Sequence, residues 1–240
     1  IIFDYSINSG EDNRIDNGES PLLSFNVKNI SAQIITAAVL DISINDPYIT
    51  LIDPSEVIGN LGPGQSINLT NAVEFSVAIN VPDNHGIDLN ILFTADGGSW
   101  QSNINLNAFS PILNLCNPIV SDNENSRLDP GETADLIIRV QNIGHSVAHN
   151  VEGIVSTSDE FITINGSGEL AFGNIPCGMI HFDTLNVSAQ PDTPDGHNAE
   201  FDYSFSAQPS FTIEGTFGLI IGRFPVLLID LHPGQMSIPV

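Results

Sequence analysis

Apolar and polar residues alternate with a period of two along much of the chain. Leu23, Phe25 and Val27 are separated by polar residues, and residues 136–140 carry Leu, Ile and Val at alternate positions. This period is typical of β-strands with one buried face. Other short segments are rich in β-branched or aromatic residues and are bounded by Gly, Pro, Asn or Asp, so we expect strands there too: 34–44, 73–81, 87–95, 147–156, 182–190, 198–206 and 210–221. No long segment has the apolar period of a helix, and the sequence predicts an all-β protein.

An internal repeat divides the chain. Residues 13–19 (Asn-Arg-Ile-Asp-Asn-Gly-Glu) return as residues 126–132 (Ser-Arg-Leu-Asp-Pro-Gly-Glu), and residues 43–51 match 156–164 at the same spacing. After one inserted residue, 58–61 match 172–175 and 80–86 match 189–196. Self-similarity at a fixed spacing is typical of repeated structural units. We therefore expect two homologous modules, residues 1–110 and 111–224.

The repeat also extends into the C-terminal tail. Residues 106–111 match 220–225, so residues 225–240 are expected to form the first strand of a further module or a truncated tail. About seven short strands in roughly 110 residues, with turn residues about every ten positions, are typical of an immunoglobulin-type antiparallel sandwich. The Cys-Trp-Cys pattern of antibody domains is absent, because Trp100 lies in module one and both cysteines lie in module two. The sequence predicts two tandem immunoglobulin-like β-sandwiches.

Charge excludes several classes of partner. The chain has 29 Asp and Glu against 5 Lys and Arg, a formal net charge of −24. Such a surface repels nucleic-acid phosphates and anionic membrane faces. The longest apolar run, residues 217–231, is interrupted by Gly, Arg, Pro and Asp, and is shorter than the ~20 residues of a membrane-spanning helix. We expect no nucleic-acid partner and no membrane span.

The repeated motif resembles a known bacterial module. Asn/Ser-Arg-Ile/Leu-Asp-x-Gly-Glu, an alternating strand, Asn-Ile-Ser/Gly, and a strand leading into Asp-Pro-Tyr or Asp-Glu-Phe are similar to CARDB-type modules. The module pair and the closing residues 221–230 resemble the region downstream of the catalytic domain in gingipain-like cysteine peptidases and related secreted multidomain proteins. This resemblance implies immunoglobulin-like sandwiches arranged in tandem in a large secreted or cell-surface protein.

Two acidic loops are candidate cation sites. Their side chains offer the hard oxygen ligands that Ca²⁺ prefers, although the spacing is not that of an EF-hand. The alternative is that each loop is a turn, in which the Glu at the start of the next strand makes a backbone hydrogen bond. The candidate ligands are Asp12, Asn13, Asp16 and Glu19 in the first loop and Asp122, Asn125, Asp129 and Glu132 in the second. Bound calcium would brace the loops and would have no catalytic role.

The two cysteines occur in module two alone. The aligned positions of module one hold Phe3 and Pro63. A disulfide between Cys116 and Cys177 would close a loop of about 60 residues and contribute ~4 kcal/mol in the chain-entropy model. Two separate thiols are the alternative, and both remain open. No peptidase signature surrounds either cysteine.

The sequence contains no recognisable catalytic motif. It lacks a Gly-x-Ser-x-Gly elbow, a phosphate-binding glycine loop and a paired-cysteine zinc signature. His145 and His149 are four residues apart, but in a strand such residues lie ~13 Å apart and cannot share one metal ion. We expect the six histidines to be surface residues without a common role, and the protein not to be an enzyme.

Two classes of function follow from these observations. The first is a non-catalytic extracellular structural or adhesion-type pair of modules, which supports or presents another domain of the same secreted or surface protein. The second is a glycan- or protein-binding module, or an accessory region of a secreted cysteine peptidase. Exposed aromatic side chains would favour binding, and buried ones would favour the structural role; the candidates are Tyr48, Trp100, Phe161 and Phe211. We expect a monomer with limited bending at the Pro-containing linker, residues 109–111.

Overall fold

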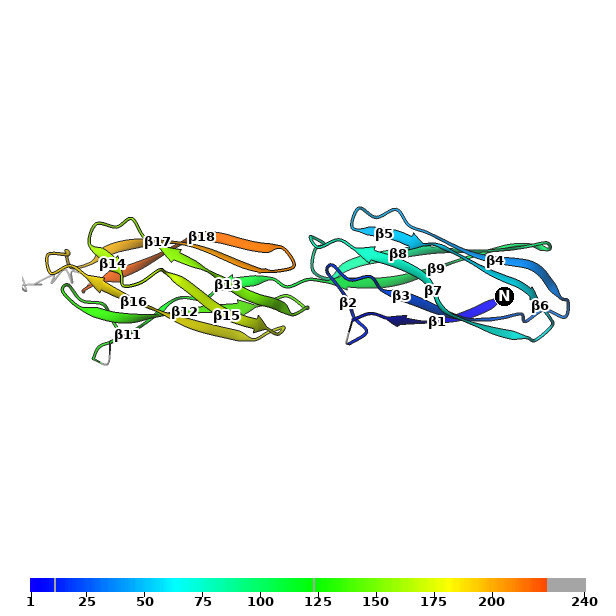
Figure 1. Cartoon of the computed structure of the whole chain (residues 1–240), viewed down its shortest axis with the longest axis horizontal. Helices are drawn as coiled ribbons and strands as arrows, with labels where there is room; N and C mark the ends of the chain where they lie inside the picture. Colours follow the sequence, from blue (N-terminus) through cyan, green and yellow to red (C-terminus); the bar gives the residue numbers. More distant parts are fainter. Residues whose placement is uncertain (11, 123, 224–240) are drawn as a thin grey trace, which may run out of the picture.

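The computed structural model describes residues 1–10, 12–122 and 124–223. The expected further strand at residues 225–240 lies outside the described residues. Figure 1 shows an N-terminal half (residues 1–110) and a C-terminal half (residues 111–223) placed end to end. All described regular elements are strands, eighteen in number, and none of the described residues forms a helix that could cross a membrane.

Two sheets build the N-terminal half. The first contains β1 (Ile2–Asn8), β3 (Leu22–Lys28), β7 (Ser66–Val77) and β5 (Ile49–Asp53), in that spatial order. The second contains β2 (Ile15–Asp16), β9 (Gly98–Phe109), β8 (His85–Ala95), β4 (Ile35–Ser43) and β6 (Ser55–Leu61). All neighbours pair antiparallel except β2, which pairs parallel with the last residues of β9.

The C-terminal half repeats this arrangement. Its first sheet contains β10 (Leu113–Leu115), β12 (Thr133–Asn142), β16 (Ile180–Ala189) and β14 (Ile162–Ile164), with β11 (Ile119–Ser121) also paired to β12. Its second sheet contains β15 (Glu169–Ile175), β13 (Ala148–Ser156), β17 (His197–Gln208) and β18 (Phe211–Ile221). β18 is the edge strand of its sheet among the described residues, and the segment equivalent to β2 contacts only its end, where the Gly222 N–H donates to the Leu128 carbonyl at 2.9 Å.

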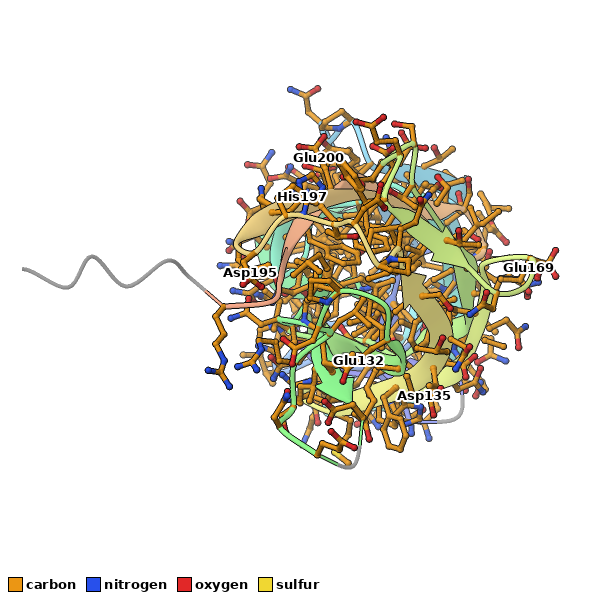
Figure 2. All side chains as sticks on the ribbon, turned by 90° about the vertical axis from the view of Figure 1, so that its left-hand side faces the viewer. Glu132, Asp135, Glu169, Asp195, His197 and Glu200 are labelled. Carbon is orange, nitrogen blue, oxygen red and sulfur yellow. The ribbon has the colours of Figure 1, made fainter. Side chains whose placement is uncertain are left out.

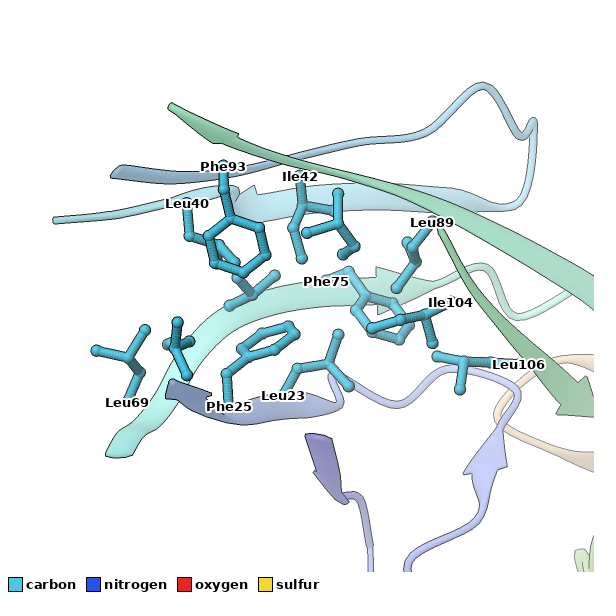
Figure 3. Close-up of a cluster of buried hydrophobic side chains, with 14 of the residues drawn as sticks. Leu23, Phe25, Leu40, Ile42, Leu69, Phe75, Leu89, Phe93, Ile104 and Leu106 are labelled. Atoms are coloured by element: carbon cyan, nitrogen blue, oxygen red, sulfur yellow. The ribbon is translucent and has the colours of Figure 1, made fainter. Parts of the chain in front are cut away.

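Each half has its own hydrophobic core between its two sheets. In the N-terminal half, Leu23, Phe25 and Phe75 from the first sheet face Leu40 and Phe93 from the second (Figure 3). The alternation of the sequence produces this core, because successive side chains of a strand point to opposite faces. In the C-terminal half the buried residues come from the equivalent strands, among them Leu136, Ile138, Val140, Phe201 and Phe205.

The all-β prediction is confirmed, and the strand predictions hold for the apolar segments. The strands at 35–43, 85–95, 148–156, 197–208 and 211–221 lie close to the predicted ranges, whereas β7 begins at Ser66, earlier than predicted. The sequence analysis missed β9 (Gly98–Phe109). Its first six residues are exposed on both faces, so this part of the β8–β9 hairpin extends beyond the core and carries no alternation to detect.

The structure corrects one part of the repeat alignment. Residues 82–85 (Pro-Asp-Asn-His) correspond to residues 194–197 (Pro-Asp-Gly-His), and not to the Pro191-Asp192 pair of the sequence alignment. Asn84 and Gly196 share a positive φ, of 57° and 79°. His85 pairs opposite Ala108 and His197 opposite Ile221, which fixes the correspondence. The turn before this motif has the same length in both halves, since the Val81 N–H donates to the Ala78 carbonyl and the Thr193 N–H to the Gln190 carbonyl. The difference in length lies in β7, which pairs with β3 with a register shift, whereas β16 pairs with β12 without one.

Candidate functional site

The repeated Asp-x-Gly-Glu motif forms the same tight turn in both halves. The Glu19 N–H donates to the Asp16 carbonyl oxygen at 3.2 Å, and the Glu132 N–H to the Asp129 carbonyl at 3.1 Å. The glycines between them, Gly18 and Gly131, have φ of 79° and 83°, as the third position of a type II turn requires. Each Glu carboxylate accepts the N–H of the Asp, at 3.0 and 2.9 Å. The backbone hydrogen bond expected from the turn alternative is therefore present in both loops.

In the first loop, the Asp16 carboxylate is partly buried and, within the part of the chain that the structure describes, lacks a stabilising partner for one of its oxygens. Its Oδ1 is buried and has no hydrogen-bond partner among the described residues. Burial raises the pKa of Asp16 to about 6, and the nearby Glu19 carboxylate adds to the shift. Arg14 opposes it only from a distance, since its guanidinium lies over the Phe109 ring, 4.4 Å from the centroid.

The second loop satisfies its carboxylates. Arg127 makes a bidentate contact with Asp129, with Nε and Nη2 at 2.6 and 2.9 Å from the two carboxylate oxygens, and Asn125 donates to the same group at 2.8 Å. These hydrogen bonds lower the pKa of Asp129 to about 2. Backbone N–H groups donate to Asp122, from Glu124, Ser126, Asn125 and Arg127, and lower the pKa of its carboxyl group.

These contacts bear on the calcium prediction. Ca²⁺ takes six to eight oxygen ligands. In the second loop, the Arg127 guanidinium and backbone N–H groups donate hydrogen bonds to the oxygens of Asp122 and Asp129. These oxygens therefore do not form a set of ligands that fits a cation. In the first loop, the Asp12 carboxylate accepts the Arg14 N–H and Glu19 accepts Ser9 Oγ and the Asp16 N–H. No group of three acidic, His or Cys side chains is assembled as a metal site within the described residues, and calcium stays a prediction.

The two cysteines are free thiols, Cys116 half-buried and Cys177 exposed. Cys116 follows β10, and its N–H donates to the carbonyl of Arg139 in β12. Cys177 lies in the turn before β16, which pairs with the opposite edge of β12. Because β12 runs between them, the two residues are about two strand spacings (~10 Å) apart, beyond the ~7 Å Cα limit for a disulfide. The structure thus holds the alternative of two separate thiols.

Three histidines are paired with an aspartate, contrary to the expectation for surface histidines. His85 Nε2 lies 2.7 Å from Asp46 Oδ2, and His197 Nε2 lies 2.7 Å from Asp159 Oδ2. An aromatic ring packs edge-on against each histidine with a centroid distance of 5.0 Å, Tyr48 in one half and Phe161 in the other. The sequence analysis missed both pairs because the partners are 39 and 38 residues apart. The repeated Asp-x-Tyr/Phe and Pro-Asp-x-His motifs were the available signal.

The third pair, Asp83 with His145, joins the two halves. Asp83 Oδ2 lies 2.7 Å from His145 Nδ1, and Oδ1 accepts the N–H groups of Ser110 and His145 at 3.1 and 3.2 Å. The Asp83 side chain is only 8% exposed. Burial opposes its ionisation, but the hydrogen bonds from His145 and Ser110 prevail and lower the pKa of Asp83. The His145 ring also packs 5.8 Å from the Phe109 ring.

The linker is fixed to the C-terminal half by a buried asparagine. Asn142 Oδ1 accepts the N–H of Ile112 at 3.1 Å and of Gly144 at 3.0 Å, and its Nδ2 donates to the carbonyls of Ser146 and Ile175. Asn29 makes the equivalent contacts in the N-terminal half, where Ser31 replaces the linker as a donor.

Glycine is required where the linker passes. A Cβ on Gly144 would overlap the Ile112 nitrogen and the Ser110 carbonyl oxygen. The Ser110 hydroxyl in turn donates to the Val81 carbonyl at 2.6 Å, a buried contact with the N-terminal half. Backbone and side-chain contacts therefore hold residues 110–112 on both sides, and we call the contacts of Asp83, Ser110, Asn142, Gly144 and His145 the junction.

The candidate aromatic residues are mostly packing residues. Tyr48 and Phe161 contact the repeated histidines, and Phe211 packs partly buried against the C-terminal core. Trp100 differs, since it is 37% exposed and lines a hollow of about 440 Å³ together with Ile34, which is 60% exposed. Trp100 is thus the one of the four that a surface partner could contact.

Comparison with known proteins identifies no family for this chain. No protein-family model matches the chain, and no curated protein matches it. Among solved structures, red sea bream transglutaminase is 11% identical with a TM-score of 0.35, over 92% of this chain and 31% of that one. Trypsin-activated alpha-2-macroglobulin from Escherichia coli is 8% identical with a TM-score of 0.35, over 92% and 18%. The YadV chaperone is 12% identical with a TM-score of 0.28, over 90% and 100%. The chain thus spans less than a third of the first two, and likeness at this level carries no functional argument.

Proposed function

We propose that the chain is a non-catalytic, extracellular pair of immunoglobulin-like modules that supports or presents another domain of a larger secreted or surface protein. The observation that carries the proposal is the junction. Linkers between independent modules tend to be polar and flexible, whereas here a carboxylate that is 8% exposed, a buried asparagine and a glycine under the linker fix the connection. A fixed connection transmits position and orientation along the molecule, as a spacer must.

Other features support the same proposal. The halves lie end to end and repeat the same sheet order (Figure 1). The hydrogen bonds of the acidic loops and of the His-Asp pairs stabilise turns within the fold. The acidic, lysine-poor composition and the resemblance to CARDB-type modules support an extracellular or cell-surface location and a tandem immunoglobulin-like fold, with module boundaries near residue 110.

The experiment measures how far the two halves bend. Small-angle X-ray scattering of the native chain should fit a single extended arrangement. Asp83→Ala should broaden the distribution of angles, because it removes the acceptor of three junction contacts. His197→Ala is the matched control, since it breaks a His-Asp pair with the same 2.7 Å distance at the end of the C-terminal half away from the junction (Figure 2). A broad distribution for the native chain would refute the spacer function.

One observation favours a second candidate function. Trp100 and Ile34 line an exposed hollow at the end of the N-terminal half, which polar side chains line as well. A glycan or a protein loop could pack on this indole ring. Trp100→Ala should abolish retention on an immobilised glycan or cell-surface extract if this site is used, with Tyr5→Ala, another exposed aromatic on a different sheet, as the control. Equal retention of both variants would reject the site.

A further inference from the structure

The edge strand β18 is longer and more regularly paired than most sheet edges of the described chain. Edge strands expose backbone donors and acceptors that can pair with another chain, and proteins protect them by shortness, bulges or charge. β10, β11 and β14 have three residues each, β5, β6 and β15 pair with register shifts, and β1 pairs regularly over only seven residues. β18, in contrast, pairs with β17 over eleven successive residues without a shift.

The composition of β18 leaves this edge unprotected. The strand contains no Pro or Lys, and Glu214 is its one charged residue, although the chain carries 29 Asp and Glu. β9, the equivalent strand of the N-terminal half, has an equally regular pairing, and β2 covers only its last two residues, Ala108 and Phe109. The end of β18 has a similar contact, since the Gly222 N–H donates to the Leu128 carbonyl at 2.9 Å. The two edges therefore differ in how far their core-facing side chains are buried.

The apolar face of β18 is incompletely covered. In β9 the core-facing residues Ile104, Leu106 and Ala108 are all buried, at 3%, 8% and 0% exposed. In β18 only Ile221 is buried, and the other apolar residues on that face remain partly exposed against the core: Phe211, Ile213, Phe217 and Leu219. A neighbouring strand would cover these four side chains, and burying apolar area contributes ~25 cal/mol per Å².

We propose that β18 pairs antiparallel with β18 of a second copy of this chain, with Thr216 on the two-fold axis. The sequence is self-complementary in this register. Ile213 faces Leu219 of the other copy, Phe211 faces Ile221, and Phe217 faces Gly215, all on the core side. Glu214 faces Gly218 and not a second carboxylate, so the register avoids a like-charge pair. The two four-stranded sheets then join into one continuous sheet.

Electrostatics makes this association depend on salt. Glu200 and Asp202 of β17 lie opposite Gly218 and Thr216, so both copies bring acidic side chains near the seam. Each copy also has a net charge of −24. Salt at about 0.5 M reduces the Debye length to a few ångströms and screens this repulsion. The sequence analysis predicts a monomer. An alternation with a period of two identifies strands but does not reveal which strand lies at the edge of a sheet, so this edge was not identified. The dimer goes beyond the spacer function and can fail independently of it.

Sedimentation and crosslinking test the proposal. The full chain should show a concentration-dependent rise toward a twofold weight-average mass at high salt, and less of it at low salt. In a Cys116→Ser, Cys177→Ser background, Thr216→Cys should form a disulfide dimer, because residues directly opposite lie about 5 Å apart. Thr212→Cys is the matched control, since in this register it lies roughly 27 Å from its copy. Both positions are exposed threonines of β18.

Each outcome decides the proposal. A native chain that stays monomeric at all salt and protein concentrations overturns it, as does a dimer that Thr216→Cys does not trap. Equal crosslinking of Thr216→Cys and Thr212→Cys also overturns it, because that result indicates random collision or another register. Unchanged circular dichroism and unfolding temperature establish that the variants are folded.

Discussion

At the residue scale, Asp16 and Asp129 show how the junction changes a repeated motif. Both begin the same turn, yet the pKa of Asp16 is raised to about 6 and that of Asp129 is lowered to about 2. The difference follows from the preceding arginine. Arg127 binds Asp129, whereas Arg14 lies over Phe109. In the structure the counterpart of Phe109 is Gly222, one residue earlier than in the sequence match, because Ala108 lies opposite His85 as Ile221 lies opposite His197. The Phe109 ring at the junction thus holds Arg14 in a position where it makes no ion pair with Asp16.

This difference predicts opposite effects of the same substitution. Because the folded-state pKa of Asp16 lies above its ordinary value of 3.8, its ionisation reduces stability as pH rises from about 4 to 6, and the full penalty is present above pH 6. Asp16→Asn should therefore raise the free energy of unfolding at pH 7.5 by the order of 1 to 3 kcal/mol, and have little effect at pH 4. Urea unfolding at both pH values measures this change.

Asp129→Asn is the matched control for that experiment. The folded-state pKa of Asp129 lies below 3.8, so its ion pair with Arg127 stabilises the fold above that pH and is lost toward pH 2. Water screens this partly exposed pair, and we expect only a small loss of stability at pH 7.5. Destabilisation by Asp16→Asn at pH 7.5 would show that the buried carboxylate has a partner that stabilises its charge.

At the scale of elements, the linker and the loop after β12 fit each other. Gly144 occupies the position of Ser31 in the N-terminal half, and a Cβ there would overlap the linker backbone. Gly144→Ser should therefore displace the linker and cost roughly 1 to 3 kcal/mol, as overpacking does. It should also weaken the contact of Asp83 with His145, which a change in the NMR chemical shifts of the His145 ring detects.

The reverse exchange is the control. Ser31→Gly removes a hydroxyl that lies 2.8 Å from both Asn29 Oδ1 and the Gln33 carbonyl oxygen and can donate to either. It should cost about 1 kcal/mol without affecting the junction. If Gly144→Ser were as mild as Ser31→Gly, the linker would not be held by close packing.

The sequence predicted the elements that depend on residues close to one another in the chain. The alternation of apolar and polar residues predicted β3 and β12, and the Asp-x-Gly-Glu spacing predicted both turns, because strand faces and turns depend on neighbouring residues. It did not identify the pairs of His85 with Asp46 and of His145 with Asp83, whose partners come together only through the sheet order. The separation of Cys116 from Cys177 likewise depends on β12 lying between them.

At the scale of the whole molecule, the large negative net charge determines how stability should depend on salt. With 29 acidic and 5 basic residues, the folded chain repels itself, and screening should relieve this repulsion. We expect the melting temperature to rise with sodium chloride between about 20 and 500 mM. An unchanged melting temperature would mean that the local contacts of the carboxylates already neutralise their repulsion.

Melting temperatures measured with calcium and with magnesium test the calcium prediction. The oxygens of Asp122 and Asp129 already accept hydrogen bonds, so calcium and magnesium at equal concentration should raise the melting temperature equally, as screening ions do. A closed calcium site would instead respond to calcium far more than to magnesium, because the two ions differ in size and ligand number. At about 100 times Kd that response would reach ~2.7 kcal/mol. A calcium-specific rise that Asp16→Asn abolishes and Asp129→Asn leaves intact would place an ion at the first loop, where Asp16 Oδ1 lacks a partner among the described residues.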